Sequence, residues 1–162
     1  MEATALLRKQ HQEVIAKFKQ FEKAESEASR RKLFVEIADA LAAHTTIEEK
    51  LFYPTAYRGE DLQDLLREAV EEHLTAKRVI SDLLMMEVTD EQFAPKVKVL
   101  RDIIEHHVQE EQDDIFPKVK KALSRGELTS LGEEMEAMFD QLITTEPRQN
   151  VPTETARAAQ LH

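Results

Sequence analysis

The sequence predicts an all-α protein: an antiparallel up-down-up-down four-helix bundle with a short fifth helix and a flexible C-terminal tail. Apolar residues recur at helical spacing along most of the 162 residues. The chain is rich in Glu, Lys, Leu and Ala, which favour helices, and it contains only 3 glycines. No segment alternates with the period of two that indicates a β-strand.

Four long helices are expected over residues 3–27, 30–57, 61–86 and 91–124. Each has an apolar stripe on one face, formed in turn by Leu7, Val14, Phe18 and Phe21; by Phe34, Ile37, Leu41, Leu51 and Phe52; by Leu62, Leu66, Ala69, Ala76, Ile80 and Leu83; and by Phe93, Val97, Leu100, Ile104, Ile115 and Val119. Polar breaks separate the helices, and residues 89–92 are typical of a capping box that opens the fourth. Connections this short favour antiparallel neighbours in a bundle.

A fifth helix is expected over about residues 131–143, capped by Ser130 and Glu133, after Gly126 ends the fourth helix. From Thr144 onward the chain is polar and has few apolar residues to bury, which indicates a flexible tail. The predicted organisation is therefore a bundle over residues 1–125, an accessory helix within 127–143 and a tail over 144–162.

The composition excludes several functional classes. The absence of cysteine excludes disulfides, iron–sulfur clusters, thiolate zinc sites and thiol nucleophiles. Three glycines are too few for a phosphate-cradling loop, and a net charge of −10 opposes binding to nucleic acid. No signal peptide or membrane-spanning stretch is visible, so we expect a cytoplasmic protein without a membrane partner.

A motif occurs twice in the chain, as HTTIEEKLFYP in the second predicted helix and as HVQEEQDDIFP in the fourth. His44 and Glu48 of the first copy correspond to His107 and Glu111, each 63 residues later. His11 and His73, in the first and third predicted helices, are 62 residues apart. The sequence therefore predicts two copies of one helical hairpin. In each copy the first helix carries a lone His and the second carries H-x-x-x-E.

These six ionisable residues lie within the apolar stripes, on the faces expected to form the core. They are also at nearly equal distances from the connections between successive helices, and equal distances mean equal heights in an antiparallel bundle. We therefore expect one layer of four imidazoles and two carboxylates, towards the end of the bundle that carries both termini and the connection at residues 58–60.

Such a layer has two interpretations. The imidazoles could simply hydrogen-bond the carboxylates, because carboxylates buried without partners are strongly destabilising. The duplicated set at one height instead favours a metal centre, since two bridging carboxylates with terminal imidazoles are the ligands of dinuclear sites in helical bundles. Nitrogen and oxygen ligands without sulfur suit iron or manganese better than zinc. A mononuclear site also remains open.

The residues His11, His44, Glu48, His73, His107 and Glu111 resemble the ligand motif of the haemerythrin-like (HHE cation-binding) family over about residues 5–120. The resemblance implies a non-haem centre of two iron ions, bridged by both glutamates and an oxo or hydroxo group. It also implies dioxygen, peroxide or nitric oxide as small-molecule partners.

One position departs from the oxygen-carrying members of that family, which have H-x-x-x-H on the third helix. Lys77 stands where the second His of that motif would be. A protonated Lys offers no lone pair to a metal, so coordination positions are left open, which favours catalysis over reversible carriage. We expect a protein that reacts with dioxygen or peroxide, for example by catalase-like peroxide removal. The alternative is a module that binds, stores or senses oxygen, nitric oxide or iron without turnover.

Three further residues are candidates for contacts around the ligands, namely Tyr53, Lys77 and His106. Tyr53 could direct its hydroxyl towards the site, and Lys77 could hydrogen-bond an exogenous ligand or extend to solvent. His106 is expected on a weaker apolar face than His107. Glu49 and Glu72, next to the motif residues, are expected mainly in solvent. The fifth helix is compatible with a monomer or a homodimer.

Overall fold

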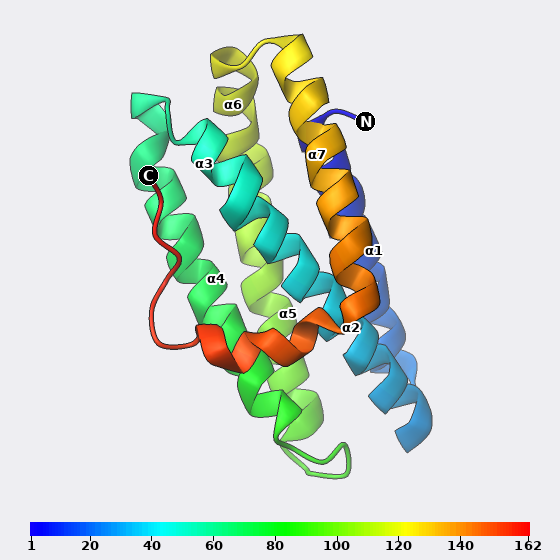
Figure 1. Cartoon of the computed structure of the whole chain (residues 1–162). Coiled ribbons are helices and arrows are strands. Elements are labelled where there is room, and N and C mark those ends of the chain that lie inside the picture. The colour runs from blue at the N-terminus through cyan, green and yellow to red at the C-terminus, as the bar shows by residue number, and fades with distance from the viewer.

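Four long helical segments run antiparallel and form a bundle (Figure 1). The computed structural model describes residues 1–162, with the side chain of Glu60 outside the description. The segments are α1 (Ala3–Lys23); α2 (Glu27–Ile47), continued by η1 (Glu48–Phe52) and α3 (Tyr53–Ala56); α4 (Gln63–Leu84), preceded by η2 (Glu60–Leu62); and α5 (Phe93–Glu110), continued by η3 (Glu111–Ile115) and α6 (Phe116–Ala122). The predicted all-α bundle is confirmed, and the described residues contain no β-strand.

Side chains cap some of these helices and not others. Glu2 accepts a hydrogen bond from the Ala5 N–H at the start of α1, and Ser26 accepts one from Ser29 at the start of α2. The capping box expected at residues 89–92 is wrong, because α5 begins at Phe93 with no side-chain cap. Asp90 instead accepts from the Gln92 N–H within the preceding loop.

The second and fourth segments each contain one widened π-helical turn at the same place in the duplicated motif. The Tyr53 N–H donates to the Glu48 carbonyl, and the Phe116 N–H donates to the Glu111 carbonyl, five residues back in both cases. The proline that follows each of these aromatic residues lacks an N–H, so the regular α-helical ladder is interrupted at this point. The prolines therefore shape the two helices without ending them.

The buried core is divided into two apolar clusters along the bundle. The upper cluster joins α3, α6 and α7 to the upper ends of α1 and α4, and it includes the aromatic residues Phe52, Tyr53 and Phe116. The lower cluster fills the opposite end of the bundle, and its large side chains include Phe18 and Phe93. The four histidines and two glutamates of the predicted layer lie near the boundary between these two clusters.

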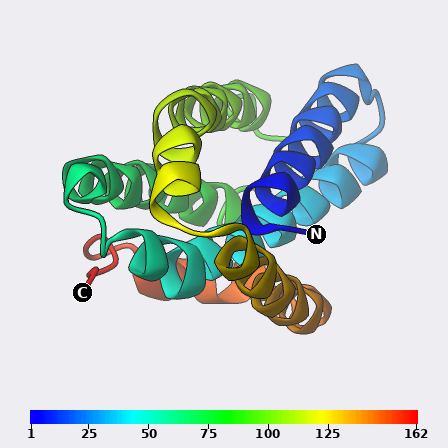
Figure 2. The same cartoon turned by 90° about the horizontal axis from the view of Figure 1, so that it is seen from above.

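The fifth helix, α7 (Arg125–Leu142), packs outside the bundle against α1 and α2 (Figure 2). It begins earlier than expected, because Ser124 and Glu127 form its capping box instead of Ser130 and Glu133. Gly126 therefore lies in its first turn and is not a stop signal. Gly132 permits the close contact with the N-terminus, since a Cβ atom there would lie 2.1 Å from the Met1 carbonyl oxygen.

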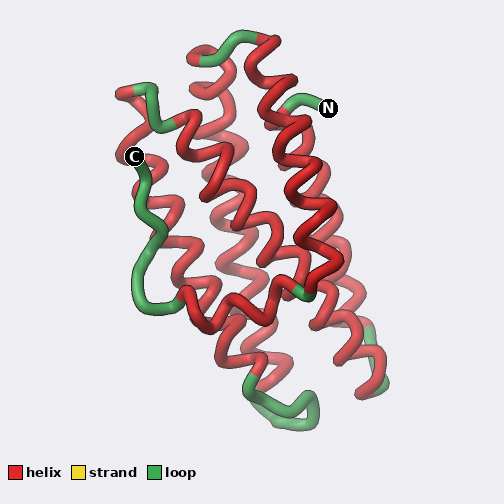
Figure 3. The backbone as a smooth tube through the Cα atoms, viewed as in Figure 1, coloured by secondary structure: helices red, strands yellow, loops and turns green.

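The C-terminal segment was expected to be a flexible tail, and the structure contradicts this. It forms two 3₁₀ helices, η4 (Ile143–Thr145) and η5 (Pro147–Glu154), and η5 packs across α2 and α4 (Figure 3). Val151 is 2% exposed within the lower cluster, and Arg148 forms an ion pair with Asp39. The buried residues of η5 are Pro147 and Val151, and together with the Arg148–Asp39 ion pair they help to hold a segment whose overall composition is polar.

Within the part of the chain that the structure describes, none of the helices combines the length and the apolar character that crossing a bilayer requires.

Candidate metal centre

The structure brings all six residues of the predicted layer together, but in the middle of the bundle and not at the expected end, because an apolar cluster lies on each side of them. His11 comes from α1, His73 from α4, and the H-x-x-x-E pairs come from the junctions α2–η1 and α5–η3. All six are buried, with the exposed fraction between 0% for the glutamates and 8% for His44. Because the π-turns begin at Glu48 and Glu111, each carboxylate stands where its helix widens.

The four histidines form two pairs, which we call the first half (His11 and His44) and the second half (His73 and His107). The carboxylates of Glu48 and Glu111 each lie between one histidine of the first half and one of the second. Glu48 Oε1 is 3.2 Å from His44 Nε2 and 3.1 Å from His73 Nε2. Glu111 is 3.0 Å from His11 Nε2 through Oε1 and 3.3 Å from His107 Nε2 through Oε2. The carboxylates therefore connect the halves, as bridging ligands of a dinuclear centre do.

All four imidazoles direct Nε2 inward and use Nδ1 to contact an oxygen outside the layer. In the first half these oxygens belong to glutamines: Gln112 Oε1 lies 3.1 Å from His11 Nδ1, and Gln10 Oε1 lies 2.7 Å from His44 Nδ1. Carboxylates serve the second half: Glu49 lies 2.7 Å from His73 Nδ1, and Glu72 lies 2.9 Å from His107 Nδ1. An oxygen at Nδ1 fixes the tautomer that leaves Nε2 free for a metal.

Sequence reasoning did not identify these outer partners, although the repeat contains a signal for them. Gln10 and Glu72 each precede the lone His, while Glu49 and Gln112 each follow the Glu of H-x-x-x-E. The expectation that Glu49 and Glu72 lie mainly in solvent is wrong, since Glu49 is 9% exposed and Glu72 is 17% exposed.

The three additional candidates lie in different places. Tyr53 is fully buried, and its hydroxyl donates to Glu111 Oε2 at 2.5 Å while lying 3.2 Å and 3.3 Å from the Nε2 atoms of His73 and His107. Lys77 is buried, but its ammonium contacts Glu49 and not the inner ligands. His106 is exposed and pairs with Glu110 at 3.0 Å.

Buried polar atoms without hydrogen-bond partners test whether these residues fit a metal. Among the described residues, such side-chain atoms are His11 Nε2, His44 Nε2, both oxygens of Glu48 and Glu111 Oε1. The atoms come within ion-pair distance of one another, yet their orientations do not give acceptable hydrogen bonds. Orphaned groups of this kind destabilise a core unless a cation satisfies them, so the residues fit a metal and the purely polar network is disfavoured.

The same residues form two groups that could each hold an ion. One consists of His11, His44, Glu48 and Glu111, and the other consists of Glu48, His73 and His107, with the ligand atoms of each group within 4.8 Å of one another. Glu48 belongs to both groups, so any two ions held here would share it. The described residues also include a third such group at the surface, formed by Glu72, His106 and Glu110.

The charges within the layer support one another. Burial alone would raise the pKa of Glu48, but the charge of His44 and the neighbouring imidazoles hold it well below its usual value. Burial alone would lower the pKa of His107, but the charge and hydrogen bonds of Glu111 raise it well above its usual value. Burial and the neighbouring carboxylates raise the pKa of Tyr53 well above its usual value. Without a metal, the layer therefore favours an ionised Glu48 near a protonated His107.

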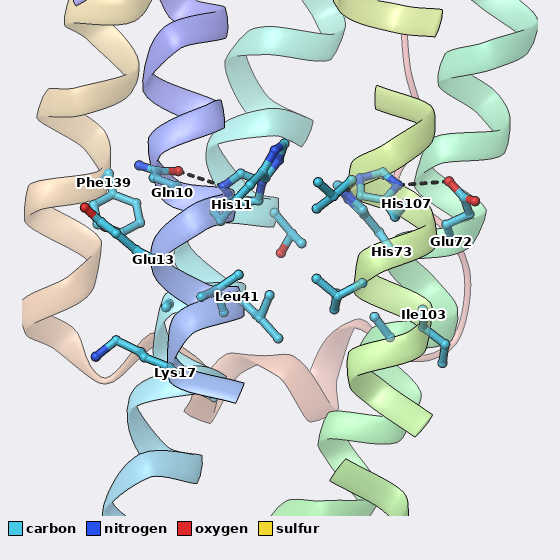
Figure 4. A pocket seen from close by; sticks show the side chains of 17 residues that line it. Gln10, His11, Glu13, Lys17, Leu41, Glu72, His73, Ile103, His107 and Phe139 are labelled. Carbon is cyan, nitrogen blue, oxygen red and sulfur yellow. Dashed lines mark hydrogen bonds and ion pairs between the residues drawn. The ribbon is translucent and has the colours of Figure 1, made fainter. Parts of the chain in front are cut away.

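A cavity of about 50 Å³ lies against the histidines on the side of the lower cluster (Figure 4). Its apolar lining includes Val14, Leu41, Ala76, Ile104 and Val108. Since one water needs roughly 10–15 Å³ of such space, the cavity has room for a few water-sized molecules. The upper side of the layer is instead packed with Phe52, Tyr53 and Phe116, so this cavity adjoins the layer from the lower side.

Comparisons with known proteins agree with this geometry. A crystal structure of a haemerythrin HHE cation-binding domain-containing protein from Mycobacterium kansasii is similar, with a TM-score of 0.77 and 26% identity, over 96% of this chain and 94% of that one. A DNA nickase from Nostoc is 27% identical over 74% of this chain and 34% of its own length. An uncharacterised haemerythrin-like protein from Schizosaccharomyces pombe is 28% identical over 54% of this chain and 44% of its own length. The chain thus spans less than half of either curated relative.

The sequence profile of the Hemerythrin HHE cation binding domain matches residues 2–119, which includes the bundle except for the end of α6 and all six residues of the layer. The chain therefore belongs to the haemerythrin HHE cation-binding family.

Proposed function

We propose that the chain is a non-haem di-iron protein that reacts with dioxygen or peroxide. The observation that carries this proposal is the position of Glu48 and Glu111, each between imidazoles of both halves, with every Nδ1 atom tied to an outer oxygen. The first half and the two glutamates would hold one ion, and the second half and the same glutamates would hold the other. Paired iron ions supply the one- and two-electron redox chemistry that reactions of dioxygen and peroxide need.

The residues of the chain determine how open the centre is. Lys77 occupies the position of a fifth histidine and contacts Glu49, so it contributes no imidazole. Tyr53 is our candidate for an additional ligand of the second half, because its hydroxyl lies within 3.3 Å of both Nε2 atoms there. Among the described residues, no comparable hydroxyl lies at the first half, where Phe116 occupies the equivalent position and stacks on His11. An exogenous ligand is therefore expected at the first half.

The proposed reaction is the disproportionation of peroxide, in which two hydrogen peroxide molecules give two waters and one dioxygen. The test is to purify the chain from iron-supplemented cells, measure iron per chain and the near-ultraviolet spectrum, and follow oxygen release from hydrogen peroxide. We expect two irons per chain and sustained oxygen release. His107→Ala should lose both properties, whereas the matched control His106→Ala, at the exposed neighbour, should keep them. Protein without iron under these conditions contradicts the proposal.

A second candidate function, reversible binding of dioxygen or nitric oxide, is favoured by the apolar lining of the cavity. It predicts a reversible spectral change and no oxygen release from peroxide. Ala76→Val tests the route of entry, because Ala76 lines the cavity. Ala69→Val is the matched control, since Ala69 is equally buried seven residues earlier on α4 but belongs to the upper cluster. We expect slower ligand binding in the Ala76 variant alone.

Nicking of DNA is not proposed for this chain. The relative with that name matches over 34% of its own length, and a net charge of −10 opposes contact with a polyanion.

A further inference from the structure

Lys77 is a charged residue inside the protein, and its partners show what it does. Its side chain is 7% exposed, and its Nζ atom lies 2.8 Å and 3.1 Å from the two oxygens of Glu49 and 3.2 Å from Glu154 Oε1. A buried ammonium group is stable only when carboxylates surround it in this way. Lys77 therefore joins the outer partner of His73 to the C-terminal segment.

The helix η5, which we call the strap, is fixed to the bundle at both ends and in the middle. At its start, Arg148 donates to Asp39 through both its backbone N–H and its guanidinium. In the middle, Val151 is buried in the lower cluster. At its end, Glu154 contacts Lys77, and Arg78 donates to the Thr155 carbonyl at 3.0 Å. The strap therefore spans α2 and α4, as the orange-red helix in Figure 1 shows, and its last residue contacts Lys77.

A continuous chain of contacts leads from the strap to one histidine of the layer. Glu154 contacts Lys77, Lys77 contacts Glu49, and Glu49 Oε2 contacts His73 Nδ1. The first half has no equivalent chain among the described residues. There the position that corresponds to Lys77 is Ile15, and the one that corresponds to Glu49 is Gln112.

We propose that Glu154 and Lys77 are positioning residues through which the strap holds Glu49 against His73. They slow the release of the ion at the second half and leave the ion at the first half unaffected. This inference rests on the proposed function, since it needs two bound ions. Residues that orient metal ligands from outside alter metal affinity by about 10–100-fold, and the strap reaches Glu49 through two further contacts, so an effect of about tenfold, at the lower end of that range, is expected.

The experiment measures how fast a strong chelator removes cobalt(II) from the fully loaded, full-length chain. Wild-type protein should release two ions in two phases of equal amplitude. His44→Ala, which removes a ligand of the first half, identifies the phase of the second half. Glu154→Gln should accelerate that phase about tenfold and leave the other unchanged. The matched control is Glu146→Gln, because Glu146 pairs with Arg148 of the strap but does not contact Lys77.

Each outcome bears on a different claim. If both release phases of Glu154→Gln match those of wild type, or if both accelerate equally, the proposed role of the strap is overturned. The proposed function stands in that case, because two ions are still bound. Glu154→Asp keeps the charge and should restore most of the slow release, which loss of folding stability alone would not allow. Lys77→Met should match Glu154→Gln in the affected phase. A wild-type chain that releases fewer than two ions overturns the proposed function and this inference together.

Discussion

The two halves of the metal centre are built alike but carry different charges. Each has two imidazoles, shares both glutamates and has an aromatic ring against the His of its first helix, Phe116 beside His11 and Tyr53 beside His73. Neutral glutamines hold the first half, whereas carboxylates and a phenol surround the second. A carboxylate at Nδ1 makes an imidazole a stronger ligand, so we expect the second half to bind the more highly charged ion more tightly.

This contrast shows how a duplicated hairpin can form a centre whose two halves differ in the charge around their histidines. The residues that are identical in the two copies set the distances between the ligands. The positions where the copies differ, Gln10 against Glu72 and Gln112 against Glu49, determine the charge around each half.

The largest expected effect comes from the glutamates, because both halves share them. Glu48→Ala should reduce bound metal from two ions to nearly none, whereas His44→Ala should leave one, as measured by elemental analysis of the loaded protein. Glu48 is fully buried and contacts imidazoles of both halves. If Glu48→Ala retained one ion, the halves would be independent sites and the comparison would not hold.

Exchanging the outer partners tests the charge difference directly. Glu72→Gln gives His107 a neutral partner and should weaken binding at the second half by about 10–100-fold. Gln10→Glu gives His44 a carboxylate and should strengthen binding at the first half. Competition titrations with a chelator measure both. Equal changes at the two halves would show that outer charge does not distinguish them.

A smaller effect is expected from the hydroxyl of Tyr53. Tyr53→Phe removes the donor to Glu111 and should destabilise the metal-free fold by about 1 kcal/mol in denaturant unfolding. It should also abolish any visible absorption from a phenolate on ferric iron while keeping two ions. Phe116→Tyr, the reciprocal change in the first half, serves as the matched variant. Unchanged visible absorption in Tyr53→Phe would rule out Tyr53 as a ligand.

The smallest expected effect is on stability as a function of pH. Burial alone would lower the pKa of His11, His73 and His107, but neighbouring carboxylates raise each above the usual 6.5. A raised histidine pKa stabilises the fold fully below 6.5, and this contribution is lost as the pH rises through the raised value. The melting temperature of metal-free protein should therefore fall as the pH rises above 6.5.

Bound metal replaces the protons on these histidines, so the melting temperature of the metal-loaded protein should not fall in the same way as the pH rises. Metal binding should weaken at low pH, most steeply at the second half, where both imidazoles have a raised pKa. Scans with and without chelator measure the difference. A metal-free protein that becomes more stable above pH 6.5 would contradict the assignment of protonated imidazoles.

The sequence alone predicted the bundle and the juxtaposition of the six ionisable residues. The repeat places these residues on the core-facing side of each helix and at similar distances from the connections between helices, so that they share one height in the bundle. It did not reveal Gln10 and Gln112, since glutamine next to a histidine is common on solvent-facing helix surfaces. The packing of the C-terminal segment was missed for a different reason. Composition indicates how much apolar surface a segment offers, but not that Pro147 and Val151 become buried where η5 crosses α2 and α4.

The matched π-turns at Glu48 and Glu111 also bear on the origin of the chain. A π-turn accommodates one extra residue, and removing that residue would rotate everything beyond it by about 100° around the helix axis. The same irregularity at the same place in both hairpins is most simply inherited from one ancestral hairpin that already contained it. Such an ancestor could pair with a second copy of itself into a symmetric dimer, and later fusion would have freed each copy to diverge.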